Sequence, residues 1–324
     1  MKSSKKRTWI TILLILAVCI VGVGIYLAES RGKSEEAVSD AEEIETDTVV
    51  YQGKKYRYNS DLELILFMGV DKSESISLQN HAGAGGQTDT LLLAVLDREQ
   101  EKVQMVSVSR DTMTDVRIYD ESGEYLATEH AQIALQYAYG TSAKRSIQMT
   151  KEAVSNLLYE VPIRSYVSLN VEGIAPIVDA MGGVTLTIPE DYTMIDPAFT
   201  QGNVLTLNGA QAEAYVRYRD QAVTGSNTQR MERQNEFLLA LFQQLNHAGL
   251  KSQDGFQRIF DSVGDYLETD LTAKEMQRLS EYEFQTEIIT LPGEMQAGTE
   301  HDEYVIDDER LYDLVLKLFY KPID

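Results

Sequence analysis

The feature that most constrains this chain is an uncharged, mostly apolar run from Trp9 to Leu27. At about 1.5 Å of rise per residue, a helix of this length crosses the roughly 30 Å hydrocarbon core of a bilayer. Basic residues precede the run, whereas acidic residues outnumber basic ones after it. This asymmetry predicts a basic cytoplasmic tail at 1–8, one transmembrane helix at 9–27 and an extracytoplasmic remainder.

A cleaved signal peptide is the alternative for this run. It is disfavoured because the run exceeds the roughly 7–15 residues of a signal core and no A-x-A site follows it. Cys19, the only cysteine, lies inside the run, so the exported part contains no disulfide. A lipoprotein anchored at Cys19 is also disfavoured, because the apolar run continues beyond it.

The charge of the exported part limits its partners. The whole chain has 324 residues and a net charge of -22. A nucleic-acid partner would require a broad basic face, so none is expected. Residues 28–60 are predicted to form an acidic tether, since Glu, Asp and Ser are frequent there and apolar periodicity is weak.

From residue 61 to 324 the pattern predicts one domain in which strands and helices alternate. Such alternation is typical of an α/β fold with helices covering a sheet. Residues 91–96 and 102–109 are joined by a turn-like segment and predict a hairpin. A further short helix is expected from Asn208, a suitable N-cap, through Ala214. The other expected strands are 64–70, 165–170, 184–188 and 288–291, and the other helices are 146–160, 172–180, about 230–245, 253–267, 272–282 and 307–319.

Charged residues stand where several of these strands end. Asp71, Asp89, Arg110 and Asp111 all occupy such positions, where binding and catalytic groups are often presented. Each aspartate can instead serve as a turn or cap residue. The glycine-rich loop at 81–86 could hold a phosphate through its backbone, but it lacks the Lys-Ser/Thr ending of a P-loop, and a mobile connection is favoured.

A second group of charges lies between 207 and 234. Arg217 and Arg219 are two residues apart, which places them on one face of an extended segment, and Arg230 and Arg233 share a helix face. Arginine forks suit phosphate oxygens, so this stretch predicts a site for phosphate or pyrophosphate. The alternative is surface ion pairing with the nearby acids Glu213, Asp220 and Glu232.

Other reaction classes find no support in the sequence. It has no H-E-x-x-H, no zinc-spaced Cys/His set and no G-x-S-x-G, so hydrolysis by a triad or zinc is not expected. Carboxylates and arginines remain, and they are typical of phosphoryl chemistry.

Seven short motifs give the chain a family resemblance. Between about Leu64 and Leu245 they occur in the order seen in LytR-CpsA-Psr proteins, which the chain resembles. The motifs are 67–71 (FMGVD), 88–90 (TDT), 107–112 (SVSRDT), 137–140 (YAYG), 178–184 (VDAMGGV), 207–209 (LNG), and 217–219 (RYR) with 230–234 (RMERQ).

The resemblance implies a central mixed sheet flanked by helices and an apolar tunnel for a prenyl chain. It implies a phosphotransferase that moves a glycopolymer from a polyprenyl-pyrophosphate carrier to peptidoglycan at the membrane. A non-catalytic module that binds or senses such lipids is the alternative. By resemblance, Asp71 and Asp89 bind Mg²⁺, the pyrophosphate is held by Arg110, Arg217, Arg219, Arg230 and Gln234, and the catalytic residues are Asp71, Asp89, Arg110 and Arg219.

Three positions depart from the family pattern. Gln87 and Gln132 stand where the family often has Arg and Lys, and Asn227 stands where it often has Asp. Two positive charges and one carboxylate are therefore missing. Either Asp111 or the substrate phosphate takes over the role of the lost carboxylate, or this member turns over slowly.

Overall fold

A computed structural model describes residues 48–72, 74–76, 81–218, 233, 237, 240, 261–271, 275, 282–298 and 302–323. The predicted tail at 1–8 and transmembrane helix at 9–27 lie outside these residues, as does most of the tether. Within the described part of the chain, none of the helices has the length and apolar character needed to cross a bilayer.

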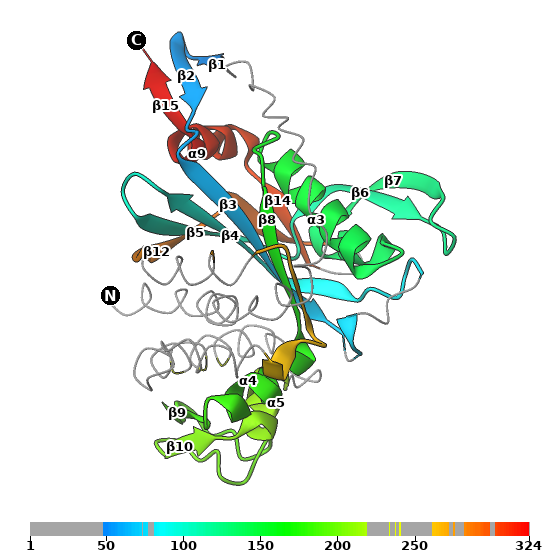
Figure 1. Cartoon of the computed structure of the whole chain (residues 1–324), viewed down its shortest axis with the longest axis vertical. Coiled ribbons are helices and arrows are strands. Elements are labelled where there is room, and N and C mark those ends of the chain that lie inside the picture. The colour runs from blue at the N-terminus through cyan, green and yellow to red at the C-terminus, as the bar shows by residue number, and fades with distance from the viewer. Residues whose placement is uncertain are drawn as a thin grey trace, which may run out of the picture.

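A six-stranded sheet forms the centre of the described structure (Figure 1). Its strand order is β11-β8-β3-β4-β5-β12, with β3 parallel to β8, β5 parallel to β12 and the other neighbours antiparallel. The sheet is therefore mixed, as the family resemblance implied. The bounds are β3 Leu62–Asp71, β4 Gln87–Asp97, β5 Lys102–Val108, β8 Ser165–Asn170, β11 Leu267–Thr269 and β12 Glu283–Thr290.

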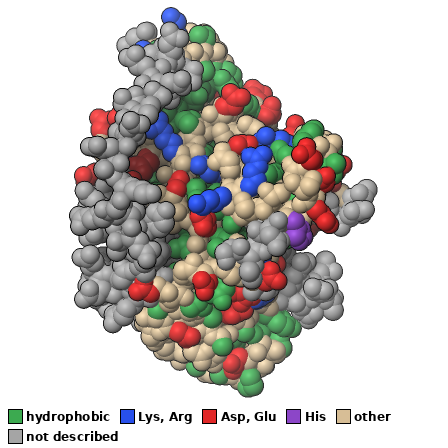
Figure 2. Space-filling model, turned by 45° about the vertical axis from the view of Figure 1, so that its right-hand side comes forward, with side chains coloured by type: hydrophobic (Ala, Val, Ile, Leu, Met, Phe, Trp, Pro, Cys, Tyr) green, Lys and Arg blue, Asp and Glu red, His purple; other side chains and the backbone are tan. Residues whose placement is uncertain are grey.

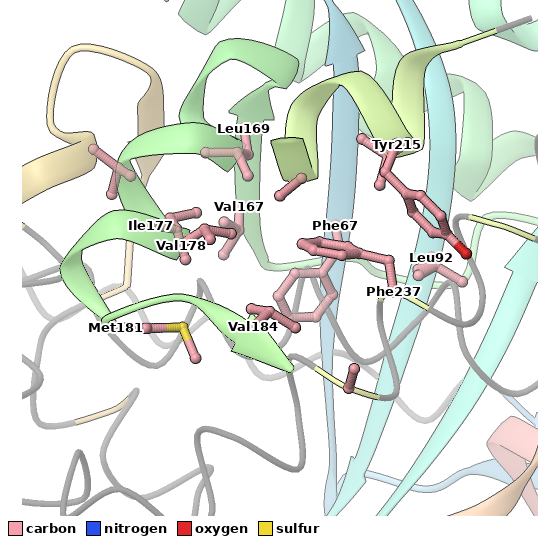
Figure 3. Packing of buried hydrophobic residues seen from close by; sticks show 14 of the residues in the cluster. Phe67, Leu92, Val167, Leu169, Ile177, Val178, Met181, Val184, Tyr215 and Phe237 are labelled. Atoms are coloured by element: carbon pink, nitrogen blue, oxygen red, sulfur yellow. The ribbon is translucent and has the colours of Figure 1, made fainter. Parts of the chain in front are cut away.

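Both faces of this sheet are buried, which explains why its central strands are apolar without alternation. Along β3, Phe67 belongs to one hydrophobic cluster, whereas Leu66 and Met68 belong to a second cluster on the opposite face. In Figure 3 the side chains of Phe67 and Phe237 lie close together within the first cluster, which also contains Tyr215. The core thus fixes the direction in which β3 and β4 deliver their terminal residues.

Helices with clear N-terminal signals flank the sheet. Ser142 caps α3 and Asp307 caps α9 through side-chain bonds to the backbone. Asn208 and Gln211 form a capping box at the start of α5, confirming the predicted N-cap. The helical bounds are η3 Ile133–Tyr139, α3 Ala143–Leu157, η4 Val171–Gly173, α4 Ile174–Ala180, α5 Gly209–Arg217 and α9 Asp308–Phe319.

Smaller sheets surround this centre, and one corrects a predicted boundary. Strand β1 (Thr48–Tyr51) pairs with β2 (Lys54–Tyr58), and β2 pairs on its other side with β15, so folded structure begins within the predicted 28–60 tether. The backbone groups of β2 are thus matched on both sides, by β1 and by the C-terminal strand. The remaining strands are β6 Met113–Tyr119, β7 Tyr125–Gln132, β9 Val184–Thr187, β10 Val204–Leu207, β13 Gly293–Ala297, β14 Asp302–Ile306 and β15 Tyr320–Ile323.

Most predicted elements in the described part are confirmed within a few residues, but the helix expected at 253–267 is not confirmed to its end. Leu267–Thr269 form strand β11, antiparallel to β8. Leu267 packs in the core and the Thr269 hydroxyl donates to the Tyr166 carbonyl, so these contacts favour pairing with the sheet edge over a helical conformation. Of the helix expected at 272–282, only 275 and 282 lie among the described residues.

Candidate functional site

Asp71 and Asp89 lie on neighbouring antiparallel strands. Asp71 ends β3 and pairs with Gln87, whereas Asp89 lies two residues further along β4, beside an irregularity in the strand register. Asp71 is exposed, and the side chain of Asp89 is 25% exposed. The register therefore places both acids toward the same end of this strand pair.

Arg110 follows β5 and is surrounded by oxygen atoms. One Nη atom forms an ion pair with Asp89, and the other donates to Gln87 Oε1 at 2.7 Å. Its Nε lies 3.5 Å from Asp111 Oδ1. A guanidinium can serve all three directions at once because its donors form a planar fork. Figure 2 shows Lys and Arg side chains gathered near the centre of one face, with acidic side chains beside them.

Asp111 is connected to the C-terminal part of the chain through Gln132. The side-chain amide of Gln132 donates to Asp111 Oδ1 at 2.8 Å and to the Asp302 carbonyl at 2.9 Å. The backbone N–H of Tyr304 donates to the Asp111 carbonyl at 2.8 Å. Gln132 therefore joins the site to β14, a contact between segments far apart in the sequence that no local pattern could have revealed.

Lys72 was not singled out by the sequence pattern. It follows Asp71 directly, is 8% exposed, and its ammonium has no hydrogen-bond partner among the described residues. Burial lowers the pKa of this ammonium, and the nearby charge of Glu74 opposes the shift. Its only sequence signal is a lysine that follows Asp71 at the end of the mostly apolar strand β3.

Arg217 corrects one sequence prediction. It is the last residue of helix α5, so the extended conformation expected for it is wrong; the buried residues Ala212, Tyr215 and Val216 continue the helix up to this point. Its Nη1 pairs with Glu172 at 2.7 Å and with Glu213 at 2.8 Å. The alternative of ion pairing with Glu213 is thus found for Arg217.

Arg233 has a structural role that the sequence did not indicate. It is 3% exposed and donates to the carbonyls of Tyr215 and Tyr218, with its guanidinium above the rings of Tyr192 and Tyr218. These contacts secure the end of α5. The remaining predicted residues of this stretch lie outside the described residues: Arg219, Asn227, Arg230 and Gln234.

Three further motifs, at 137–140, 178–184 and 207–209, make contacts within the fold. Tyr137 is buried and its hydroxyl lies 3.1 Å from Ser168 Oγ, while a Cβ at Gly140 would lie 2.3 Å from the Ser146 nitrogen. Asp179 accepts from the Gly209 N–H at 2.7 Å, joining α4 to the start of α5. These residues hold neighbouring elements together through close packing and hydrogen bonds.

Among the described residues, no group of three or more His, Cys, Asp or Glu side chains is arranged to hold a metal ion. Mg²⁺ typically takes one or two carboxylates and completes its shell with water and substrate phosphate, so the donor atoms of Asp71 and Asp89 are of the kind that it binds. Asp89 is presently paired with Arg110, so a cation there would share or replace this contact.

The fold and site define an α/β protein with acidic and arginine side chains at strand ends, an arrangement suited to a phosphate-bearing ligand. The sequence model of the LytR_cpsA_psr family matches residues 22–318. The chain therefore belongs to the LytR-CpsA-Psr family, as its motifs predicted.

Named relatives and solved structures agree. The chain is 31% identical over 283 residues to a polyisoprenyl-teichoic acid–peptidoglycan teichoic acid transferase TagU of Halalkalibacterium halodurans, covering 85% of this chain and 83% of that protein. It is 28% identical to the TagU of Bacillus subtilis, covering 85% and 81%. The crystal structure of B. subtilis TagU superposes with a TM-score of 0.53 at 25% identity, covering 82% of this chain and 100% of that one.

Proposed function

We propose that this enzyme transfers an anionic glycopolymer, of the teichoic acid type named for its relatives, from a polyprenyl-pyrophosphate carrier to peptidoglycan. Family membership and the transferase names of the relatives support the reaction class. The observation that carries the proposal is Arg110 held between Asp89, Gln87 and Asp111 at the strand ends. Such a constellation binds and orients phosphate groups.

In the proposed reaction, an acceptor hydroxyl of peptidoglycan attacks the phosphorus that bears the glycopolymer. A new P–O bond forms, the P–O–P bond of the carrier breaks, and prenyl monophosphate leaves. Arg110 orients the phosphate and stabilises the charge that develops on it. Asp111, beside Arg110 and held by Gln132, is placed to take the hydroxyl proton.

A divalent cation is part of the proposal. Asp71 and Asp89 would hold Mg²⁺, which when bound supplies neutralisation of pyrophosphate charge. The oxygen chemistry and adjacent strands of these two residues support the assignment. Arg219, Arg230 and Gln234 stay predicted pyrophosphate ligands on the strength of the family resemblance.

We further propose that residues 9–27 anchor the enzyme in the membrane, with the N-terminus in the cytoplasm and the domain outside. The charge asymmetry around this run supports that orientation. It would keep the domain beside a lipid-linked substrate.

The test uses the full chain in detergent with Mg²⁺, a prenyl-pyrophosphate-linked sugar and a peptidoglycan fragment. Release of prenyl phosphate together with sugar-labelled fragment is expected. The neutral side chains at Gln87 and Gln132 favour a second candidate, a binding or sensing module. Tight carrier binding without any release would favour that alternative.

A further inference from the structure

The cations described near the predicted phosphate site are already matched by protein groups. Arg110 faces Asp89, Gln87 and Asp111. Arg217 is paired with two glutamates, and Arg233 is bound to backbone carbonyls. Gln87 and Gln132 add no charge. Among the described residues, a cation without such a partner would therefore add to the charge that Arg110 shares with its protein neighbours.

Lys72 is the described residue that fits this need. It stands at the carboxyl end of β3, directly after Asp71, with 8% of its surface exposed. Within the described residues its ammonium finds no hydrogen-bond acceptor. A buried ammonium without a hydrogen-bond acceptor is unfavourable, because it has lost water and the nearby charge of Glu74 offsets only part of that cost. Such a group is best explained by a partner that binds later.

The neighbouring strand also ends in an unsatisfied polar atom. Asn170 ends the neighbouring strand β8 and pairs with Val70. Its Nδ2 donates to the Glu74 carbonyl at 2.7 Å, but its Oδ1 is buried without a partner among the described residues. Both a donor and an acceptor are thus unsatisfied at the ends of two adjacent strands, where α/β proteins commonly bind ligands.

Gly86 closes the glycine-rich loop onto this point. Its φ of +77° is a conformation that glycine adopts readily, and a Cβ there would lie 2.7 Å from the Asp71 carbonyl and 3.3 Å from Lys72 Cβ. Only glycine lets the loop approach the backbone of Asp71 and Lys72 so closely. The backbone of the loop at Gly86 therefore lies against the base of the Lys72 side chain.

We propose that the Lys72 ammonium binds a phosphate oxygen of the carrier's pyrophosphate, supplying a positive charge that Gln87 and Gln132 do not. This inference rests on the proposed function, because it requires an anionic ligand at the end of β3. The chemical class is a pyrophosphate monoester or diester.

The experiment uses the full chain in detergent and three variants, Lys72→Met, Lys72→Arg and the control Lys151→Met. Lys151, on helix α3, is a suitable control because its ammonium already has a partner: it donates to the Arg164 carbonyl at 2.7 Å. Affinities for farnesyl pyrophosphate and farnesol are measured by calorimetry. Lys72→Met is expected to weaken farnesyl pyrophosphate by about 10- to 150-fold, the range for a charged hydrogen bond, and to leave farnesol unchanged.

Lys72→Arg should retain part of the affinity, and Lys151→Met should retain all of it. Thermal unfolding adds an independent readout: without ligand, Lys72→Met should be at least as stable as the parent, because an unpaired buried charge is removed. A clear loss of stability, or an affinity within about twofold of the parent where a charged contact predicts tenfold or more, overturns the role of Lys72 alone. Absence of farnesyl pyrophosphate binding in the parent overturns the proposed function as well.

Discussion

Replacing Gln132 with Leu tests the contact that joins Asp111 to the antiparallel pair β13–β14. Gln132 is 7% exposed and its amide makes two hydrogen bonds, to Asp111 Oδ1 and to the Asp302 carbonyl. A neutral hydrogen bond contributes about 0.5–1.5 kcal/mol and one to a charged group about 1.5–3 kcal/mol. Because the Asp111 side chain is 18% exposed, water can recover part of the lost bond. We therefore expect the free energy of unfolding to fall by about 2–3 kcal/mol.

Equilibrium denaturation of the full chain in detergent measures this change. The matched control is Gln148→Leu, since the Gln148 amide donates to Glu152 at 3.0 Å on the exposed face of α3. A surface pair of this kind contributes about 0.2–0.5 kcal/mol, so the control should change little. If the free energies of unfolding of Gln132→Leu and Gln148→Leu differed by less than about 0.5 kcal/mol, well below the value of a buried charged contact, the two hydrogen bonds of Gln132 would not stabilise the folded state as argued.

Three further outcomes are expected. Asp89→Ala should abolish release of prenyl phosphate, because it removes a carboxylate needed for phosphoryl chemistry. Since no apolar surface is removed, affinity for the prenyl chain should stay within about twofold of the parent, and loss of lipid binding in calorimetry would contradict this. Burial raises the pKa of Tyr137 from 10.0 to about 12, so this residue adds no pH dependence below pH 10. Between pH 10 and 12 only the unfolded state releases the proton, and the free energy of unfolding therefore falls by about 1.4 kcal/mol per pH unit. When the free energy of unfolding is measured across that range, its fall with pH should be shallower for Tyr137→Phe than for the parent, whereas the exposed control Tyr125→Phe should match the parent. Protease added to intact protoplasts should remove the domain and leave a fragment containing 9–27, and complete protection would reject an outward-facing domain.

The sequence predicted the centre of the fold well because burial on both faces leaves a strong signal. Residues 64–70 and 91–96 are apolar throughout, and both lie in central strands. The hairpins β6–β7 and β13–β14 were missed, since their strands alternate weakly and leave side chains such as Leu126 and Met295 exposed. Register and turn geometry, rather than hydrophobicity, define these hairpins.

The site was predictable where residues follow strands and unpredictable where they meet from distant segments. Asp89 and Arg110 stand at the ends of predicted strands, and they form an ion pair. The two-residue spacing of Arg217 and Arg219 suggested an extended segment, but the cap at Asn208 and the buried face of α5 keep Arg217 helical. Spacing between two charged residues is a weak signal compared with capping and burial.

The C-terminal part of the chain, to which the sequence assigned no role, contributes backbone groups to the site. The Tyr304 N–H and the Asp302 carbonyl hold Asp111 and Gln132, and Thr112 forms a bridge with Tyr304. Because these contacts use backbone atoms, side-chain identity in β14 leaves almost no trace of them in the sequence. The hairpin would orient Asp111 whatever residues it carries, provided that β13 and β14 keep their register. It follows that changes to the β13–β14 pairing should disturb the site more than exchanges of its exposed side chains.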